Sequence, residues 1–173
     1  MKLVLAACGC AAAIASTPAS AQEIFGGLYK HDVKTPLVKS GNIEDGADIM
    51  VGWRGGRIGA TPLQPYVYGA LNTAGDTSYA AAGLSAKFGG QLYIRPGLGI
   101  AIHTGSSAGF ENPFNDKVEF GSRVLFAPEL GIGVQFSPRT SAELSFVHLS
   151  HAQLRGGQNP GLDNIGVRVN FAF

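Results

Sequence analysis

The stretch QLYIRPGLGIAIH, residues 91–103, alternates between two kinds of side chain along its length. Every second residue is apolar, and the residues between them are polar, small or aromatic. Successive side chains of a β-strand point to opposite faces, so this pattern predicts a strand with one apolar face. The apolar face carries Leu92, Ile94, Pro96, Leu98, Ile100 and Ile102; the other carries Gln91, Tyr93, Arg95, Gly97, Gly99, Ala101 and His103.

The same alternation recurs along the chain and predicts eight strands in all. After residue 21, no run approaches the ~20 apolar residues that a membrane-spanning helix needs. Strands of ~10 residues with one apolar face instead suit a tilted crossing of a membrane. Clear strands are expected at 78–88, 91–103, 121–136 and 163–173, and weaker ones near 23–33, 46–55, 63–72 and 140–150.

The segments between these strands alternate between short and long. The short ones are 56–62, Gly89-Gly90 and 137–139; the longer ones are 34–45, 104–120 and 151–162, with 72–77 intermediate. Outer-membrane barrels have tight periplasmic turns and longer outer loops. The predicted fold class is therefore all-β: an eight-stranded antiparallel up-and-down transmembrane β-barrel, with a lumen filled by side chains. An aromatic girdle at the turn end is expected from Trp53, Phe88, Phe136 and Phe173.

The composition excludes several other classes. Only 14% of the 173 residues are charged, with 13 Lys+Arg against 12 Asp+Glu, so no basic surface for nucleic acid is expected. The 25 glycines disfavour a helical bundle, and the 45% of hydrophobic residues disfavours disorder. A soluble periplasmic β-sandwich or lipocalin-like barrel remains the alternative, although soluble surfaces usually carry ~25–35% charge. Here the sparse charges Arg95, Glu129, Glu143 and Arg168 can pair across a narrow lumen.

The first 21 residues have the pattern of a secretory signal peptide. Lys2 precedes an apolar run from Leu3 to Ala15, and Ala19-Ser20-Ala21 is a small-x-small cleavage site. A lipoprotein signal ending at Cys8 is disfavoured, because only five apolar residues would precede that cysteine. We therefore expect residues 1–21 to be removed and residues 22–173 to form a single domain in the bacterial outer membrane. Both cysteines leave with the signal, so no cysteine-based metal site is expected.

Polar residues with catalytic potential lie where the last two strands meet. On a strand, residues i and i+2 share a face, so His148 and Ser150 are neighbours about 6.6 Å apart at Cα. Asp163 begins the next antiparallel strand and is expected beside His148, where it would fix the imidazole tautomer. Nucleophile, base and orienting carboxylate would then come from two adjacent strands.

The face on which these three residues are expected suggests the substrate. His148 and Ser150 continue the row of Leu144 and Phe146, and Asp163 continues the row of Ile165. Both rows should contact lipid. Polar groups facing lipid are costly unless they lie at the interface and serve a function. A lipid ester in the outer leaflet, reached laterally from the membrane, is therefore the expected substrate.

The motif His148-Leu149-Ser150, the loop with Asn159-Pro160-Gly161 and the acidic Asp163 resemble the signature of PagL-type lipid A 3-O-deacylases. Residues 27–33 also resemble the first strand of that family. The resemblance is most specific over residues 143–173. It implies an eight-stranded outer-membrane barrel that removes the 3-O-linked acyl chain of lipid A, with no metal and no cofactor.

The resemblance also assigns roles to individual residues. It makes Ser150 the nucleophile, His148 the base and Asp163 the acid partner, although the family often has Glu at that position. Apart from the resemblance, we expect Asn159 or backbone amides near Ser150 to stabilise the oxyanion and Arg155 to steer lipid phosphates. The residue after the serine is commonly Asn in the family, whereas this chain has His151.

Other interpretations stay open. His148 and Ser150 could form an interfacial polar pair in a non-catalytic barrel, either structural or adhesin-like. The protein could also be an esterase that acts on a different outer-membrane lipid. His151 is expected to be an exposed loop residue, and His31 and Asp32 are expected in the lumen or at its rim. Residues 105–109 match G-x-S-x-G, but no helix pattern follows, so a chance match is favoured. The expected partners are lipid A or lipopolysaccharide and the membrane, not nucleic acid, with a homodimer considered.

Overall fold

The computed structural model describes residues 22–38, 41–109, 116–152 and 159–173, and their regular structure is entirely β-strand. In this part of the chain, no helix is long and apolar enough to cross a lipid bilayer. The expected signal peptide lies outside the described residues. The strands are β1 (Glu23–Lys30), β2 (Ala47–Arg54), β3 (Leu63–Asn72), β4 (Tyr79–Ala86), β5 (Phe88–Gly89), β6 (Leu92–His103), β7 (Val124–Gln135), β8 (Thr140–Leu149) and β9 (Leu162–Ala172).

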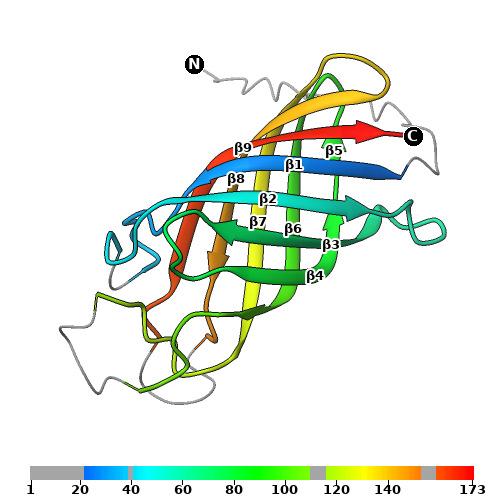
Figure 1. The fold of residues 1–173 in the computed structure, drawn as a ribbon. Helices are drawn as coiled ribbons and strands as arrows, with labels where there is room; N and C mark the ends of the chain where they lie inside the picture. Colours follow the sequence, from blue (N-terminus) through cyan, green and yellow to red (C-terminus); the bar gives the residue numbers. More distant parts are fainter. Residues whose placement is uncertain (1–21, 39–40, 110–115, 153–158) are drawn as a thin grey trace, which may run out of the picture.

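The strands form one closed antiparallel barrel (Figure 1). Each strand pairs with its neighbour along the chain except that β4 and β5 do not pair with each other, and both pair with β6; β1 pairs with β9. The short β5 continues β4 in the same register against β6, because Ser85 lies opposite Gly97 and Phe88 lies opposite Ile94. The nine segments are thus eight barrel strands, one of them interrupted at Lys87, and the predicted fold is confirmed.

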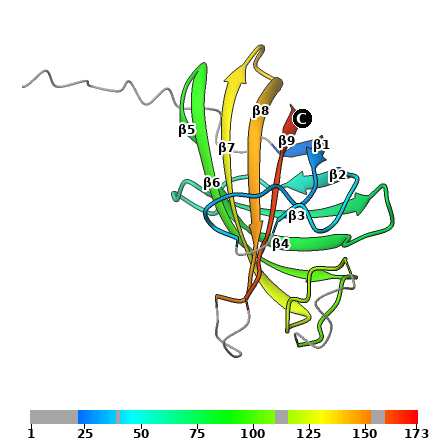
Figure 2. The same cartoon turned by 90° about the vertical axis from the view of Figure 1, so that its left-hand side faces the viewer.

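The two ends of the barrel differ as expected from the connection lengths (Figures 1 and 2). The longer connections, from β1 to β2, β6 to β7 and β8 to β9, lie at one end, here called the loop end. The tight connections and the C-terminus lie at the other, the turn end. Strand β1 stops at Lys30, three residues before the expected limit, because Asp32 adopts a left-handed backbone (φ 46°) and the chain leaves the sheet.

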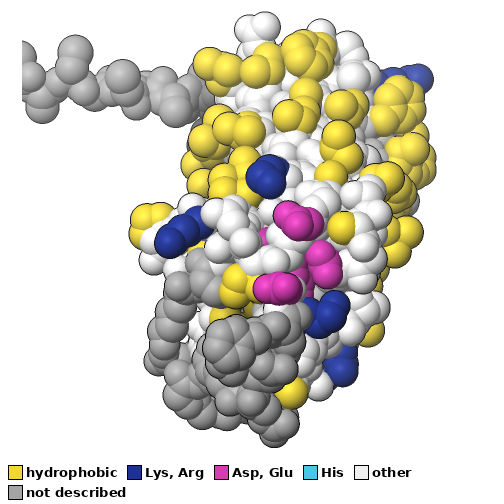
Figure 3. Space-filling model, turned by 60° about the vertical axis from the view of Figure 1, so that its left-hand side comes forward, with side chains coloured by type: hydrophobic (Ala, Val, Ile, Leu, Met, Phe, Trp, Pro, Cys, Tyr) yellow, Lys and Arg dark blue, Asp and Glu magenta, His cyan; other side chains and the backbone are white. Residues whose placement is uncertain are grey.

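The outer wall is apolar. Figure 3 shows hydrophobic side chains spread over the wall, with charged side chains gathered toward the loop end. A water-soluble barrel would bury such a face, whereas a barrel in a bilayer exposes it to acyl chains. The most exposed apolar side chains on the strands include Leu28, Val51, Leu71, Leu92, Leu98, Ile102, Leu144 and Val167, and the expected aromatic girdle at the turn end is exposed at Trp53, Phe88, Phe136 and Phe173.

The lumen holds a network of buried charges. Glu143 pairs with Arg168 at 2.7 Å and with Arg95 at 2.9 Å. Arg168 also pairs with Glu129 at 3.1 Å, which confirms the expected pairing across the lumen. Glu23 adds contacts of 2.6 Å to Arg54 and 2.8 Å to Arg95. Three buried arginines are thereby matched by three carboxylates, as buried charges require.

Glycine makes room for this filling. At Gly133, a Cβ would lie 2.3 Å from Cζ of the buried Tyr93 ring. At Gly166, a Cβ would lie 2.5 Å from Cγ of Tyr29. The high glycine content therefore serves large side chains packed inside a narrow barrel.

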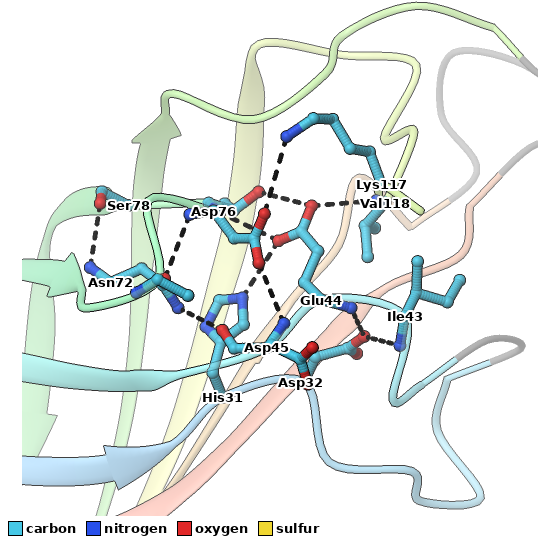
Figure 4. A network of polar contacts seen from close by, with 12 residues as sticks. His31, Asp32, Ile43, Glu44, Asp45, Asn72, Asp76, Ser78, Lys117 and Val118 are labelled. Atoms are coloured by element: carbon cyan, nitrogen blue, oxygen red, sulfur yellow. Dashed lines mark hydrogen bonds and ion pairs between the residues drawn. The ribbon is translucent and has the colours of Figure 1, made fainter. Parts of the chain in front are cut away.

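A second polar cluster closes the loop end of the lumen (Figure 4). His31, just after β1, contacts Asp48 at 2.9 Å and Glu44 at 3.0 Å. Glu44 also accepts hydrogen bonds from Val118 N at 2.9 Å and from Thr77. Its carboxylate therefore links the β1–β2, β3–β4 and β6–β7 connections. Burial disfavours a charged imidazole, but the hydrogen bonds to Asp48 and Glu44 outweigh it and raise the pKa of His31 to about 9.

Candidate active site

His148 and Asp163 lie opposite each other on adjacent strands. They are register partners in the β8–β9 ladder, near its loop end. His148 Nδ1 lies 2.5 Å from Asp163 Oδ1. The imidazole is partly exposed, with 14% of its side-chain surface accessible, whereas the Asp163 carboxylate is fully covered. The sequence expectation that Asp163 lies beside His148 agrees with this geometry.

Asp163 is not in contact with lipid, and that expectation is wrong. The segment that follows β1 folds over it; residues 33–38 are here called the β1 strap. Val33 N donates a 2.7 Å hydrogen bond to the Asp163 carbonyl oxygen, and the Thr35 hydroxyl donates to Asp163 Oδ2. Asp163 belongs to the outward row of β9, but the strap shields it from the membrane because the chain turns back across the end of β9.

Ser150 follows the end of β8 and is held by β7. Its N–H and carbonyl exchange hydrogen bonds of 3.1 and 2.7 Å with Phe126, which continues the β7–β8 register by one bridge. Ser150 therefore stays on the same outer row as His148, about 6.6 Å away at Cα. It is buried there, whereas contact with lipid was expected. Among the described residues, the structure has no hydrogen bond between Ser150 and His148. Catalytic hydrogen bonds are often long in the absence of substrate and tighten in the complex.

The loop after Ser150 differs from the sequence expectation in two respects. His151 is buried, with 4% of its surface accessible, whereas an exposed residue was expected. Its N–H donates to Asn159 Oδ1 at 3.2 Å, and the Ser150 N–H is bonded to Phe126. These two backbone amides are therefore engaged in the structure and are not free to donate to an oxyanion. Asn159 thus uses its Oδ1 as an acceptor here, and Arg155 lies outside the described residues.

Gly161 packs directly against the imidazole. Its φ of +74° favours glycine, and a Cβ there would lie 3.1 Å from His148 Cε1 and 3.0 Å from Val38 Cγ1. Gly161 therefore lets the loop before β9 and the β1 strap close together beside His148.

The sequence did not identify Thr35 as part of the site. The residue lies 128 positions before its partner in the chain, and the pattern Thr35-Pro36 indicates only a turn. The hydroxyl does accept a 3.0 Å hydrogen bond from Leu37 N, as such turns do. The match at 105–109 is still best read as a chance match, because the described residues after it, from 116 onward, form no helix, and Arg123 donates to Gly105 O and Ser107 Oγ.

No metal site is evident near this constellation. Within residues 22–38, 41–109, 116–152 and 159–173, no group of three or more His, Cys, Asp or Glu side chains could hold a metal ion. His148 and Asp163 are occupied with each other. The arrangement suits proton transfer by an oriented imidazole beside a serine hydroxyl.

A closed eight-stranded barrel with an apolar wall and a polar constellation on that wall defines a small outer-membrane β-barrel protein. The family model described as "Lipid A 3-O-deacylase (PagL)" matches residues 45–172. The chain belongs to this PagL family and is a bacterial outer-membrane protein. No curated protein matches it significantly.

Solved structures share the fold. The crystal structure of the outer membrane enzyme PagL matches with a TM-score of 0.59 and 18% identity, over 86% of this chain and 98% of that chain. Neisserial surface protein A matches with a TM-score of 0.51 and 14% identity, over 88% and 97% of the two chains. The Yersinia pestis outer membrane protein Ail matches with a TM-score of 0.49 and 15% identity, over 89% and 99%. These comparisons give no support to a homodimer.

Proposed function

We propose that this protein is a serine esterase of the outer membrane that hydrolyses the 3-O-linked acyl chain of lipid A. The observation that carries the proposal is the His148–Asp163 hydrogen bond on the outer wall, where His148 lies on the same row as Ser150. Membership of the PagL family supports lipid A as the substrate. The acyl ester would reach the site laterally from the outer leaflet, because His148 is accessible on the outward face of β8.

The hydrogen-bond pattern determines which nitrogen of His148 acts. Nδ1 carries the proton donated to Asp163, so Nε2 is unprotonated and can accept the Ser150 proton. Ser150 Oγ attacks the ester carbonyl as that proton leaves. The carboxylate of Asp163 stabilises the imidazolium that forms.

The remaining steps follow from the same groups. The His148 imidazolium returns its proton to the departing glucosamine alkoxide, which leaves an acyl group on Ser150. A water molecule then gives a proton to His148 and attacks the acyl carbonyl. The bond to Ser150 Oγ breaks, His148 returns that proton to Ser150 Oγ, and the fatty acid is released. Asn159 Nδ2 is the proposed oxyanion donor; one such donor is typically worth about 3–4 kcal/mol. Arg155 is proposed to bind lipid phosphates.

Mass spectrometry of lipid A from cells that express the protein tests this function. Wild type should yield lipid A that lacks one 3-O-linked acyl chain, and Ser150→Ala should leave lipid A intact. Ser145→Ala is the matched control, because Ser145 lies on the same strand but faces the lumen. Its lipid A should match that of wild type.

The alternatives predict other outcomes of the same comparison. A non-catalytic barrel predicts identical lipid A with and without expression, provided that heat-dependent gel mobility shows the barrel folded. A different lipid esterase predicts intact lipid A together with hydrolysis of purified phospholipid by wild type and not by Ser150→Ala.

A further inference from the structure

The β1 strap makes two hydrogen bonds to a single residue of the proposed site. Val33 N bonds the Asp163 carbonyl oxygen, and the Thr35 hydroxyl bonds the Asp163 carboxylate at Oδ2. The strap lies before residue 45, so it is outside the segment that the family model matches. Val38, which ends the strap, is buried near Gly161.

The Asp163 carboxylate depends on these contacts because it is fully buried. One oxygen, Oδ1, accepts from His148, and the other, Oδ2, accepts from Thr35. A buried carboxylate oxygen without a partner is costly, and a donor to it holds its orientation. Thr35 therefore fixes the rotation of the carboxylate and aims Oδ1 at His148 Nδ1.

We propose that Thr35 is a positioning residue that acts through Asp163, and this inference rests on the proposed function. The Thr35 hydroxyl does not touch the reacting atoms. It sets the orientation and the basicity of Asp163, and through Asp163 it sets the proton affinity of His148. The order of action is Thr35, Asp163, His148 and Ser150.

A purely structural role for Thr35 makes a different prediction. The Thr35 hydroxyl also accepts a hydrogen bond from Leu37 N. If its role is purely structural, a substitution loosens the strap and leaves the pH dependence of kcat unchanged. Thr73 provides the matched control, because its hydroxyl accepts a 3.0 Å hydrogen bond from Ala47 N at the same end of the barrel. Thr73→Val thus loses a comparable backbone contact without touching the site.

The test must distinguish His148 from the other charged or ionisable groups near the strap. Lys34 in the strap is exposed, and His151 after Ser150 is buried. Asp32, before the strap, accepts hydrogen bonds from the N–H groups of Ile43 and Glu44. His151 also carries an imidazole ring, so the His148 ring signal is assigned by its loss in His148→Gln.

The experiment compares purified wild type with Thr35→Val, Thr35→Ser and Thr73→Val. Thr35→Val keeps the side-chain shape and removes the hydroxyl, and Thr35→Ser restores the hydroxyl. Two quantities are measured in detergent: the pH profile of kcat for lipid A deacylation, and the pH titration of the His148 ring by NMR. The second requires no catalytic activity.

The proposal predicts that kcat of Thr35→Val falls about tenfold to thirtyfold, whereas Thr35→Ser and Thr73→Val stay within about threefold of wild type. Without the donor, Asp163 becomes a stronger base, so the acid limb of the kcat profile and the His148 titration of Thr35→Val both move to higher pH. A fall in kcat with the acid limb and the titration unmoved would overturn the proposal. So would wild-type behaviour of Thr35→Val.

Failure of the proposed function would look different. If wild type leaves lipid A intact, the proposed function fails, and the role of Thr35 in it fails as well. If wild type is active and Ser150→Ala is not, while Thr35→Val titrates like wild type, only the role of Thr35 is refuted.

Discussion

Replacing Asp163 by Asn should remove most of the activity while leaving the barrel folded. The carboxylate accepts from His148 at Oδ1 and from Thr35 at Oδ2. Asn has nearly the same shape, but it has no charge and only one acceptor oxygen. If its NH2 group faces His148, the imidazole must carry its proton on Nε2 and can no longer accept the Ser150 proton.

The magnitude follows from the lost charge. The imidazolium and carboxylate charges are spread over their groups, so their centres lie roughly 4 Å apart. At that separation and an effective dielectric constant of ~20, their attraction is about 4 kcal/mol. At 1.36 kcal/mol for each tenfold change in rate, kcat should fall about a thousandfold. The inverted tautomer would lower it further.

The assay is release of fatty acid from purified lipid A by wild type, Asp163→Asn and Asp48→Asn. Asp48 is the control, because it is also a buried Asp in contact with a histidine, His31, but lies away from Ser150 on β2. Asp48→Asn should keep deacylation within about threefold of wild type at a temperature where it stays folded. Asp163→Asn with wild-type kcat in folded protein would refute the assignment of Asp163 as the partner of His148.

Three further predictions follow from the same structure. Gly161→Ala should lower kcat at least tenfold, because its Cβ would lie 3.1 Å from His148 Cε1 at a φ of +74°. Gly69→Ala, where a Cβ meets nothing within 4 Å, should leave kcat unchanged. Equal rates for the two variants would contradict the packing argument. Glu143→Gln should lower the free energy of unfolding in urea by about 3–5 kcal/mol, because the buried charges of Arg95 and Arg168 then lose one of their carboxylate partners. An unchanged urea midpoint would argue against the ion-pair network as a source of stability. The pKa of His31, about 9 against an ordinary 6.5, implies stabilisation that is complete below pH 6.5 and lost as pH rises through 9. That loss should amount to about 3 kcal/mol in unfolding experiments and disappear in His31→Gln, and a flat stability profile in wild type would count against it.

Much of the barrel could be predicted from the sequence because the two faces of its wall have different surroundings. The outer face meets acyl chains and the inner face holds polar and aromatic groups, so alternation persists along each strand. Residues 63–72 were expected as a strand and form β3 with those limits. The break at Lys87 was not expected, because the alternation runs through it and the register against β6 is unchanged.

The placement of His148, Ser150 and Asp163 could also be predicted from the sequence, because it follows from strand geometry. His148 and Ser150 are two residues apart, and a strand fixes their common face. Asp163 is the second residue of the neighbouring strand β9, so antiparallel pairing brings it opposite His148. Local periodicity and a single hairpin therefore place all three residues.

The parts of the site that depend on loops could not be predicted in this way. The β1 strap covers Asp163 only because the chain turns after His31, and no periodic pattern encodes which strand a loop crosses. The burial of His151 and the engagement of its N–H by Asn159 likewise depend on how the loop after β8 folds. The contacts of the β1 strap join residues far apart in the chain, and the His151–Asn159 contact is a single hydrogen bond within one loop.

The proposed function requires Ser150 to be a nucleophile activated on the outer wall of the barrel. Labelling of the detergent-folded protein with a long-chain alkyl fluorophosphonate, followed by peptide mass spectrometry, tests it most directly. We predict a single phosphonate adduct on the peptide that contains Ser150, formed at least a hundredfold more slowly in His148→Ala. An adduct on another serine, or equal labelling of wild type and His148→Ala, would contradict the account.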